Sequence, residues 1–232
     1  MALDLVTELV HDIRSPLAAI MVLSAQLSRS GDVSDHHRRQ LTMVYSAALG
    51  MEALMGDAME LATGGGQLST EEPALFSVGE VIQWVADMVA PIAVGKGVEL
   101  RTSFPDEELR WGHRAPLGRI LLNLATNALH STDEGHVEII ATPSAKGSVV
   151  PFAVRDTGRG IAPAALEALL QRVRLPEETG KYPRSGLGLP ICRRLLRAMG
   201  SELEVESRPD CGTRFHFRLD LPLRGSFPGR LD

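Results

Sequence analysis

Apolar residues recur every three or four positions through the first sixty residues, the spacing that places them on one side of a helix. This pattern predicts one helix from residue 2 to about residue 29, and a second that Ser34 or Asp35 can cap. Three glycines at 64–66 end the second helix. Two long helices joined by a short turn form an antiparallel hairpin, and the stripe it leaves uncovered predicts a dimeric four-helix bundle. The alternative is a hairpin that packs on the rest of its own chain.

The remaining chain mixes helical and alternating patterns. Ser77 and Glu80 form a capping-box pattern that predicts a helix ending near Pro91. Two more helices are predicted over 116–131 and 188–199. The second of these is expected to hold its basic residues on the solvent side, namely Arg193, Arg194 and Arg197. Alternating residues predict strands at 98–102, 137–142, 149–155, 203–206 and 215–219.

The predicted fold class is α+β, with a helical hairpin followed by an α/β sandwich whose helices cover one face of a mixed sheet. The expected boundaries are 1–66 for the hairpin domain, 67–74 for a linker rich in Gly, Ser, Thr and Glu, 75–223 for the second domain and 224–232 for a tail.

Composition excludes several classes of protein. Hydrophobic residues make up 44% of the chain and charged residues 23%, as in soluble globular proteins, and the net charge of -5 gives no reason to expect nucleic-acid binding. No apolar run approaches the length of a membrane span, and no basic segment marks a signal peptide. Cys192 and Cys211 lack metal-ligand spacing and fit a reduced, cytosolic setting. Because a helical pattern starts at Met1, we expect an upstream input segment to be missing.

The first helix carries a possible reactive group. His11 lies off the centre of the apolar stripe, and Asp12 follows it. Pro16 has no N–H to donate, which predicts a kink one turn beyond the histidine. A lone histidine on a helix is more often an ordinary surface or core residue, so its role depends on the rest of the chain.

Three further motifs could bind a nucleotide. Asn123 and Asn127 lie four residues apart on one helix face, where carboxamides could orient a hydrated Mg²⁺ and phosphate oxygens. Asp156 ends a strand before a glycine-rich turn and could accept a hydrogen bond from an exocyclic amine. Gly186 and Gly188 open a helix whose N–H groups favour an anion. Each motif alone also fits a packing pair, a tight turn or a flexible loop.

The order of the motifs is more specific than any one of them. His-Asp-x-x-Ser-Pro-Leu is followed by Asn-x-x-x-Asn-Ala, Asp-x-Gly-x-Gly, Gly-x-Gly-Leu and finally Gly-Thr-Arg-Phe. Across almost the whole chain, this series resembles the sensor histidine kinases of two-component signalling. The first part is similar to their dimerisation and histidine-phosphotransfer domain. The second is similar to their ATP-binding catalytic domain, whose fold is shared with the gyrase and MutL ATPases.

The resemblance implies a role for each matching position. His11 matches the phosphoacceptor, Asp12 the adjacent general base, and Ser15 the position one turn later that borders the reaction site. Asn127 matches the Mg²⁺ ligand. The positions that match the nucleotide site are Asn123, Asn127, His130, Asp156, Gly158, Gly160, Ile161, Arg172, Gly186, Leu187, Gly188, Leu189 and Thr213.

The function that the resemblance implies is transfer of the γ-phosphoryl group of ATP to His11, and from there to an aspartate of a response-regulator receiver domain. It implies ATP and Mg²⁺ as cofactors, a homodimer and a cytoplasmic location. Two alternatives stay open, namely a nucleotide-binding pseudokinase that signals by conformation, and an ATPase of the same fold without a phosphohistidine.

Some positions depart from the family pattern. The family commonly has a basic residue at the position of His130 and often an aromatic residue at that of Ser131. Leu170 and Val173 occupy the usual positions of paired phenylalanines, although Arg172 remains between them. Ser15 replaces the more usual Thr or Asn, which predicts a kinase with weak phosphatase activity.

Overall fold

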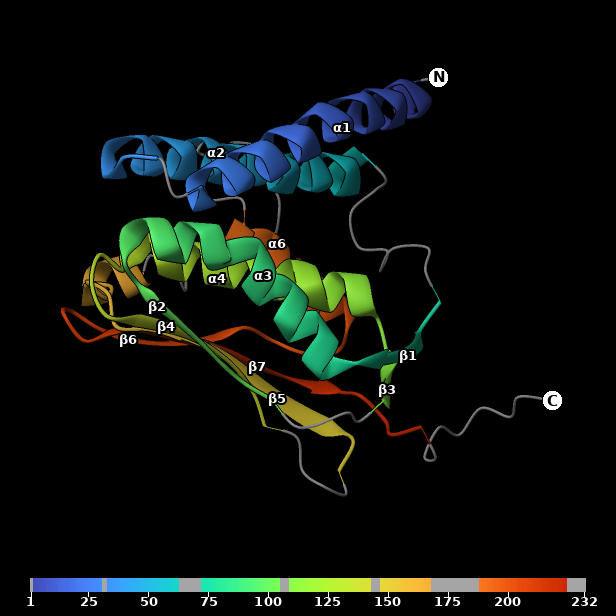
Figure 1. Cartoon of the computed structure of the whole chain (residues 1–232). Coiled ribbons are helices and arrows are strands. Elements are labelled where there is room, and N and C mark those ends of the chain that lie inside the picture. Colours follow the sequence, from blue (N-terminus) through green and yellow to red (C-terminus); the bar gives the residue numbers. More distant parts are fainter. Residues whose placement is uncertain are drawn as a thin grey trace.

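The computed structural model describes residues 2–30, 33–62, 72–104, 109–142, 147–167 and 188–224. These residues form three layers (Figure 1). The N-terminal helical hairpin lies over a layer of helices, and that layer covers one face of a β-sheet. The predicted α+β fold, with helices on one face of a mixed sheet, is confirmed.

The hairpin consists of α1 (Ala2–Arg29) and α2 (Asp35–Ala62), as predicted from the two apolar runs. α1 continues through Pro16. The side-chain oxygen of Ser34 accepts a backbone N–H from the first turn of α2 at 3.4 Å and so caps that helix. The Arg38 guanidinium donates to the carbonyl oxygen of Ser28, which ties the start of α2 to the end of α1.

The apolar stripe of α1 divides between two sides of the helix. Val10, Leu17 and Met21 are buried in the hairpin, whereas Ile13 and Ile20 expose 39% and 42% of their surface. A single partner helix, here α2, can cover only part of the wide apolar stripe on α1. A band of apolar side chains on α1 therefore stays at the surface of the single chain.

The second domain begins with a core helix, α3 (Val78–Lys96). The predicted cap is confirmed, because the Ser77 side chain accepts the backbone N–H of Glu80 at 3.2 Å. Among the described residues, α3 alone has the length and composition of a membrane span, a property that buried core helices share. Ile82 and Val85, which have no exposed surface, place this helix in the core.

The predicted end of α3 near Pro91 is wrong. The helix passes through this proline to Lys96 and is capped by Gly97, which adopts a left-handed conformation with φ 70° and donates its N–H back into the last turn. Ile92 and Ala93 are both 2% exposed. We attribute the continuation to their burial, which outweighs the one hydrogen bond that Pro91 removes.

The five-stranded sheet has the order β2-β4-β5-β7-β6. Its strands are β2 (Glu99–Ser103), β4 (His136–Ala141), β5 (Val149–Asp156), β6 (Glu204–Arg208) and β7 (Gly212–Asp220). β2 and β4 are parallel, and the other neighbours are antiparallel. Phe152 and Phe217 stack across β5 and β7 with ring centroids 5.1 Å apart and belong to the buried core.

The structure adds two short strands that no sequence pattern predicted. β1 (Ala74–Ser77) pairs antiparallel with β3 (Leu109–Gly112) in a separate two-stranded sheet. Arg110 of β3 is fully buried and donates to the carbonyl oxygens of Gly147 and Leu221 at 2.9 and 3.0 Å. Strands of four residues offer too few alternating positions for a pattern to stand out.

Two more helices, α4 (Arg114–Ser131) and α6 (Gly188–Ala198), complete the middle layer. The expectation that every arginine of α6 lies on the solvent side is wrong for Arg193, which is 8% exposed. Its position borders the buried side of the helix beside Cys192, and the long stem of an arginine can cover apolar surface there. Arg197 is exposed, as expected.

α2 docks the hairpin on the middle layer (Figure 1). The Tyr45 hydroxyl donates to the carbonyl oxygen of Met88 at 2.6 Å. Gly95 of α3 permits a close approach, since a Cβ at this position would lie 2.1 Å from Oγ1 of Thr42. The hairpin therefore packs on its own second domain, which is the alternative that the sequence left open beside the dimer.

Candidate functional site

The two asparagines of α4 line one side of the site. Asn123 is 8% exposed, and its buried Nδ2 has no hydrogen-bond partner within the described residues. Asn127, one turn later, is half-buried. The start of α6 lies against the first carboxamide, because a Cβ on Gly188 would lie 3.5 Å from Cγ and Oδ1 of Asn123. Two of the predicted motifs therefore meet at the Asn123 carboxamide, whose oxygen lies on the side of Gly188.

Asp156 ends β5 and is held by the backbone. Its Oδ1 accepts the N–H of Gly158 at 2.9 Å and the N–H of Thr213 at 3.2 Å. Because both of these bonds use Oδ1, the second oxygen, Oδ2, can accept a hydrogen bond from a ligand. Burial raises the pKa of the Asp156 carboxyl, and the two backbone N–H groups partly offset this rise.

The glycine turn after β5 packs too closely for larger residues. A Cβ on Gly158 would lie 2.2 Å from the carbonyl oxygen of Ser131, at the end of α4. Gly160 has φ 63°, and a Cβ there would lie 2.0 Å from the carbonyl oxygen of Arg208. The next residue, Ile161, donates its N–H to Ser207 at 2.8 Å. The turn thus joins the end of α4 to β6 and β7.

A cavity of about 570 Å³ lies at this end of the sheet. Asp156 and Thr213 line it, together with Ser207, whose hydroxyl lies 2.9 Å from that of Thr213. A buried carboxylate beside hydroxyl groups suits a flat, polar heterocycle.

His130 occupies the last turn of α4 and connects the site to the hairpin. Its Nε2 lies 3.1 Å from the hydroxyl of Ser46 on α2. Burial and then the nearby Lys96 ammonium lower the pKa of this imidazole. The neutral ring is therefore favoured at neutral pH, so His130 contributes a hydrogen-bonding group rather than a fixed positive charge.

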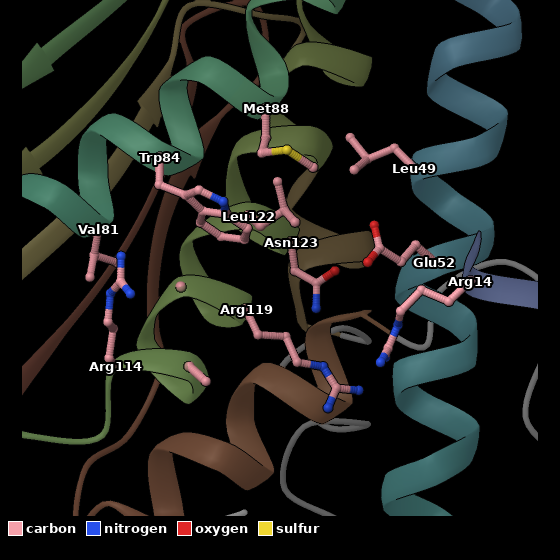
Figure 2. A pocket seen from close by; sticks show the side chains of 12 residues that line it. Arg14, Leu49, Glu52, Val81, Trp84, Met88, Arg114, Arg119, Leu122 and Asn123 are labelled. Carbon is pink, nitrogen blue, oxygen red and sulfur yellow. The ribbon is translucent and has the colours of Figure 1, made fainter. Parts of the chain in front are cut away.

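A second cavity, of about 480 Å³, separates the hairpin from α3 and α4 (Figure 2). Asn123 and Arg119 line it from α4, Trp84 and Met88 from α3, and Arg14 and Glu52 from the hairpin. The candidate phosphoacceptor helix and the asparagine helix thus contribute to one cavity.

The structure places the remaining predicted residues as follows. His11 lies in α1 three residues before Arg14, and its side chain is outside the described part of the structure. Asp12 and Ser15 are exposed on the same helix. Leu189 is half-buried and packs on the core. Arg172, Gly186 and Leu187 lie outside the described residues, as do Leu170 and Val173.

Two family models match the chain in the order that the motifs predict. Residues 1–67 match the His Kinase A (phospho-acceptor) domain, and residues 112–223 match the histidine kinase-, DNA gyrase B-, and HSP90-like ATPase domain. The chain belongs to the sensor histidine kinases. The chain carries both the phospho-acceptor domain and the ATPase domain of this family, and the two together are called the kinase core below.

Named relatives align over nearly all of this kinase core. It is 32% identical to the virulence sensor protein BvgS of Bordetella bronchiseptica over 224 residues, which are 92% of the chain and 18% of that protein. It is 28% identical to the sensor protein EvgS of Escherichia coli K12, with the same coverage. For the adaptive-response sensory kinase SasA of Synechococcus, identity is 30% over 91% of the chain and 55% of that protein. The kinase core thus spans less than two thirds of each relative.

The chain is also similar to solved structures of this family. The crystal structure of full-length ShkA in complex with AMPPNP matches 95% of the kinase core and 46% of that chain, with a TM-score of 0.62 and 26% identity. The catalytic domain of the histidine kinase ThkA matches 65% of the kinase core with a TM-score of 0.53 and shows the fold.

Several residues of the kinase core's second cavity were not singled out from the sequence. Arg119 lies four residues before Asn123 and therefore on the same helix face, a spacing that could have identified it. Glu52 and Arg14 carry no such signal, because only the docking of the hairpin brings them to this place, and Trp84 lies here because α3 packs on α4.

Proposed function

We propose that this kinase core transfers the γ-phosphoryl group of ATP to His11 and then to an aspartate of a separate response-regulator receiver domain. The observation that carries the proposal is the cavity shared by α1, the helix of His11, and α4, the helix of the two asparagines. A phosphoryl group leaving a nucleotide held on α4 would have to travel only across this cavity to reach α1.

Adenine is the base that fits Asp156. The Oδ2 oxygen of its carboxylate accepts a hydrogen bond from the exocyclic amine, while Oδ1 stays bound to the backbone N–H groups of Gly158 and Thr213. The glycine turn packs against the ends of α4 and β6 and so holds the backbone next to Asp156 in place. Guanine presents a carbonyl where adenine presents its amine, so this arrangement favours ATP over GTP.

Asn127, with support from Asn123, would hold a Mg²⁺ ion together with the phosphates. An amide oxygen is a ligand that Mg²⁺ accepts, and this ion usually keeps several waters and phosphate oxygens in its shell. The Nδ2 of Asn123, which is buried and has no hydrogen-bond partner among the described residues, supplies a donor for a phosphate oxygen. When bound, the ion would neutralise the charge of the transferring phosphoryl group.

The chemical step needs a nucleophile and a base. A neutral imidazole nitrogen of His11 attacks the γ-phosphorus, the new N–P bond forms, and the bond to the bridging oxygen breaks to release ADP. The carboxylate of Asp12 takes the proton from the other ring nitrogen. Asp12 follows His11 directly on α1, so it must reach round the helix to do so.

The test is to incubate the protein with ATP labelled at the γ-phosphate. We expect label on the chain that is lost in acid and kept in base, as a phosphohistidine requires. Release of inorganic phosphate without labelled protein would indicate an ATPase instead. Nucleotide binding without either product would indicate a pseudokinase.

Ser15 is expected to set the phosphatase activity. It is exposed one turn after His11, and serine lacks the methyl group that restrains the rotamer of threonine. Ser15→Thr should increase the rate of dephosphorylation of the phospho-regulator about threefold. Restraining one side-chain rotamer is worth roughly 0.7 kcal/mol, which corresponds to a change of this size. Autophosphorylation should change little. The measurement is the loss of phosphate from purified phospho-regulator in the presence of ADP, and equal rates for Ser15, Thr and Ala variants would contradict the role.

The apolar band on α1 is proposed as the centre of a homodimer. Ile13, Ile20 and Leu27 recur every seven residues and expose 39%, 42% and 51% of their surface. On α2, Val44 and Met51 have the same spacing and expose 47% and 54%. Two hairpins that join these bands would form the four-helix bundle expected from the sequence.

A charge in this band should separate the dimer. Ile20→Asp and Met51→Asp should each weaken dimerisation at least tenfold, because an unpaired carboxylate would be buried. Val94→Asp on α3 is the matched control, since this valine is 69% exposed and lies outside the band. Light scattering at micromolar concentration gives the mass, and a wild-type monomer would contradict the proposed dimer.

The kinase core is further proposed to work in the cytoplasm, downstream of a sensor segment. Phospho-acceptor domains of this family signal to response regulators, and the relatives above are much longer than this chain. A response regulator and ATP are both cytoplasmic, and this supports the location proposed.

A further inference from the structure

We propose that Arg119 binds the γ-phosphate of ATP in the cavity between the domains, with Arg14 as a second guanidinium supplied by the docked hairpin. The inference rests on the proposed function, and it assigns to that site a residue that distinguishes ATP from ADP.

One stripe of α4 leads from the adenine end of the site to this arginine. Ser131, whose carbonyl oxygen accepts the N–H of Arg159, lies beside the glycine turn. Asn127, Asn123 and Arg119 follow at intervals of four residues toward the start of the helix. Each step is about 6 Å along the axis and returns to nearly the same face. A nucleotide with its base at Asp156 and its phosphates along this face ends at Arg119.

The cavity has the charge that a terminal phosphate requires. Arg14 and Arg119 line the part of it next to Asn123, against one carboxylate, that of Glu52, whereas Arg114 lies at its other end beside Val81. Figure 2 shows the guanidinium groups of Arg119 and Arg14 directed from opposite sides into the space next to Asn123. Apolar side chains, Leu49 and Met88 among them, line the same cavity, and ionic hydrogen bonds are stronger beside apolar surface than in open water.

A guanidinium suits this role because its planar fork can bind two phosphate oxygens at once. ADP ends at the β-phosphate and does not reach this fork, so Arg119 contributes to the affinity for ATP and not to that for ADP. Arg14 comes from α1 and reaches the phosphate only while the hairpin is docked, so its contribution depends on the contact between the domains.

The experiment compares nucleotide affinities of the full chain and its Arg119→Gln variant by calorimetry. The probes are ADP and a non-hydrolysable ATP analogue, both with Mg²⁺. We expect the variant to bind the analogue about tenfold more weakly and ADP within about twofold of wild type, the size expected for a lost charge-assisted pair. Arg119→Lys should recover part of the loss, since it keeps the charge without the fork. Arg14→Gln should weaken the analogue about threefold and leave ADP unchanged.

Arg114→Gln is the control for net charge. Arg114 lies beside Val81, on the far side of Trp84 from Asn123, so its loss should leave both affinities unchanged (Figure 2). Equal losses for the analogue and ADP in Arg119→Gln, or no loss for either, would overturn the assignment. A wild-type chain that binds neither nucleotide would instead contradict the proposed function, and retained ADP binding shows that each variant is folded.

Discussion

Replacing His11 with glutamine should abolish acid-labile phosphorylation and leave nucleotide binding and folding unchanged. Glutamine has no nucleophilic ring nitrogen, so the N–P bond cannot form, whereas the residues proposed to hold ATP lie outside α1 apart from Arg14, which is proposed to contact only the γ-phosphate. The expected loss is therefore complete for labelling and within about twofold for ADP affinity, because no nucleotide contact is removed. The measurement is incorporation of γ-labelled phosphate, followed by calorimetry with ADP.

His36→Gln is the matched control for this prediction. His36 is an exposed histidine in the first turn of α2 and belongs to no proposed site, so labelling should remain at the wild-type level. Normal labelling of the His11 variant would show that another residue accepts the phosphoryl group. Loss of labelling in both variants would point to a change in the hairpin rather than to a missing nucleophile.

Replacing Asp156 with asparagine should weaken ATP binding by roughly 10- to 100-fold, as expected for a lost hydrogen bond of about 1.5–3 kcal/mol to a charged group. GTP binding should change far less, because guanine presents a carbonyl oxygen at this position and therefore has no hydrogen bond to the Asp156 carboxylate that the substitution could remove. Calorimetry with both nucleotides measures the difference. Asp210→Asn is the control, since Asp210 is exposed in the nearby turn with φ 57°, a conformation that asparagine tolerates.

The same substitution should not destabilise the protein without nucleotide. Burial raises the pKa of the Asp156 carboxyl, so the folded state holds its proton to higher pH than the unfolded chain does. The stability that this protonated group contributes is present below the unfolded pKa and is lost as pH rises through the folded pKa. Asparagine avoids the buried charge at neutral pH and keeps an oxygen for Gly158 and Thr213. The melting temperature at pH 7 should therefore equal or exceed that of wild type, and a clear fall would show a structural role.

The sequence pattern predicted helix ends and helix ranges correctly where the interactions that determine them are local. The cap of α3 depends on Ser77 and Glu80, three residues apart, and the structure confirms it. The two hairpin helices also match their predicted ranges, because a capping serine and an apolar repeat define them within a few turns.

The candidate site was predicted in part for the same reason. Asn123, Asp156 and Gly188 belong to short motifs, and the structure shows contacts that connect each to the rest of the site. Arg119 was not singled out because its importance depends on a cavity between two domains. Its one local signal is the spacing of four residues to Asn123.

The sequence by itself determined the α+β class, the helical hairpin, the order of the nucleotide-binding motifs and the helices and strands with strong periodicity. Only the tertiary structure decided that α3 continues through Pro91, that Arg193 is buried, and that α2 docks on α3 through Tyr45 and Gly95. These outcomes share one physical reason. Local patterns report which conformations a segment prefers, whereas burial and close approach depend on surfaces that are far apart in the chain and meet only after it has folded.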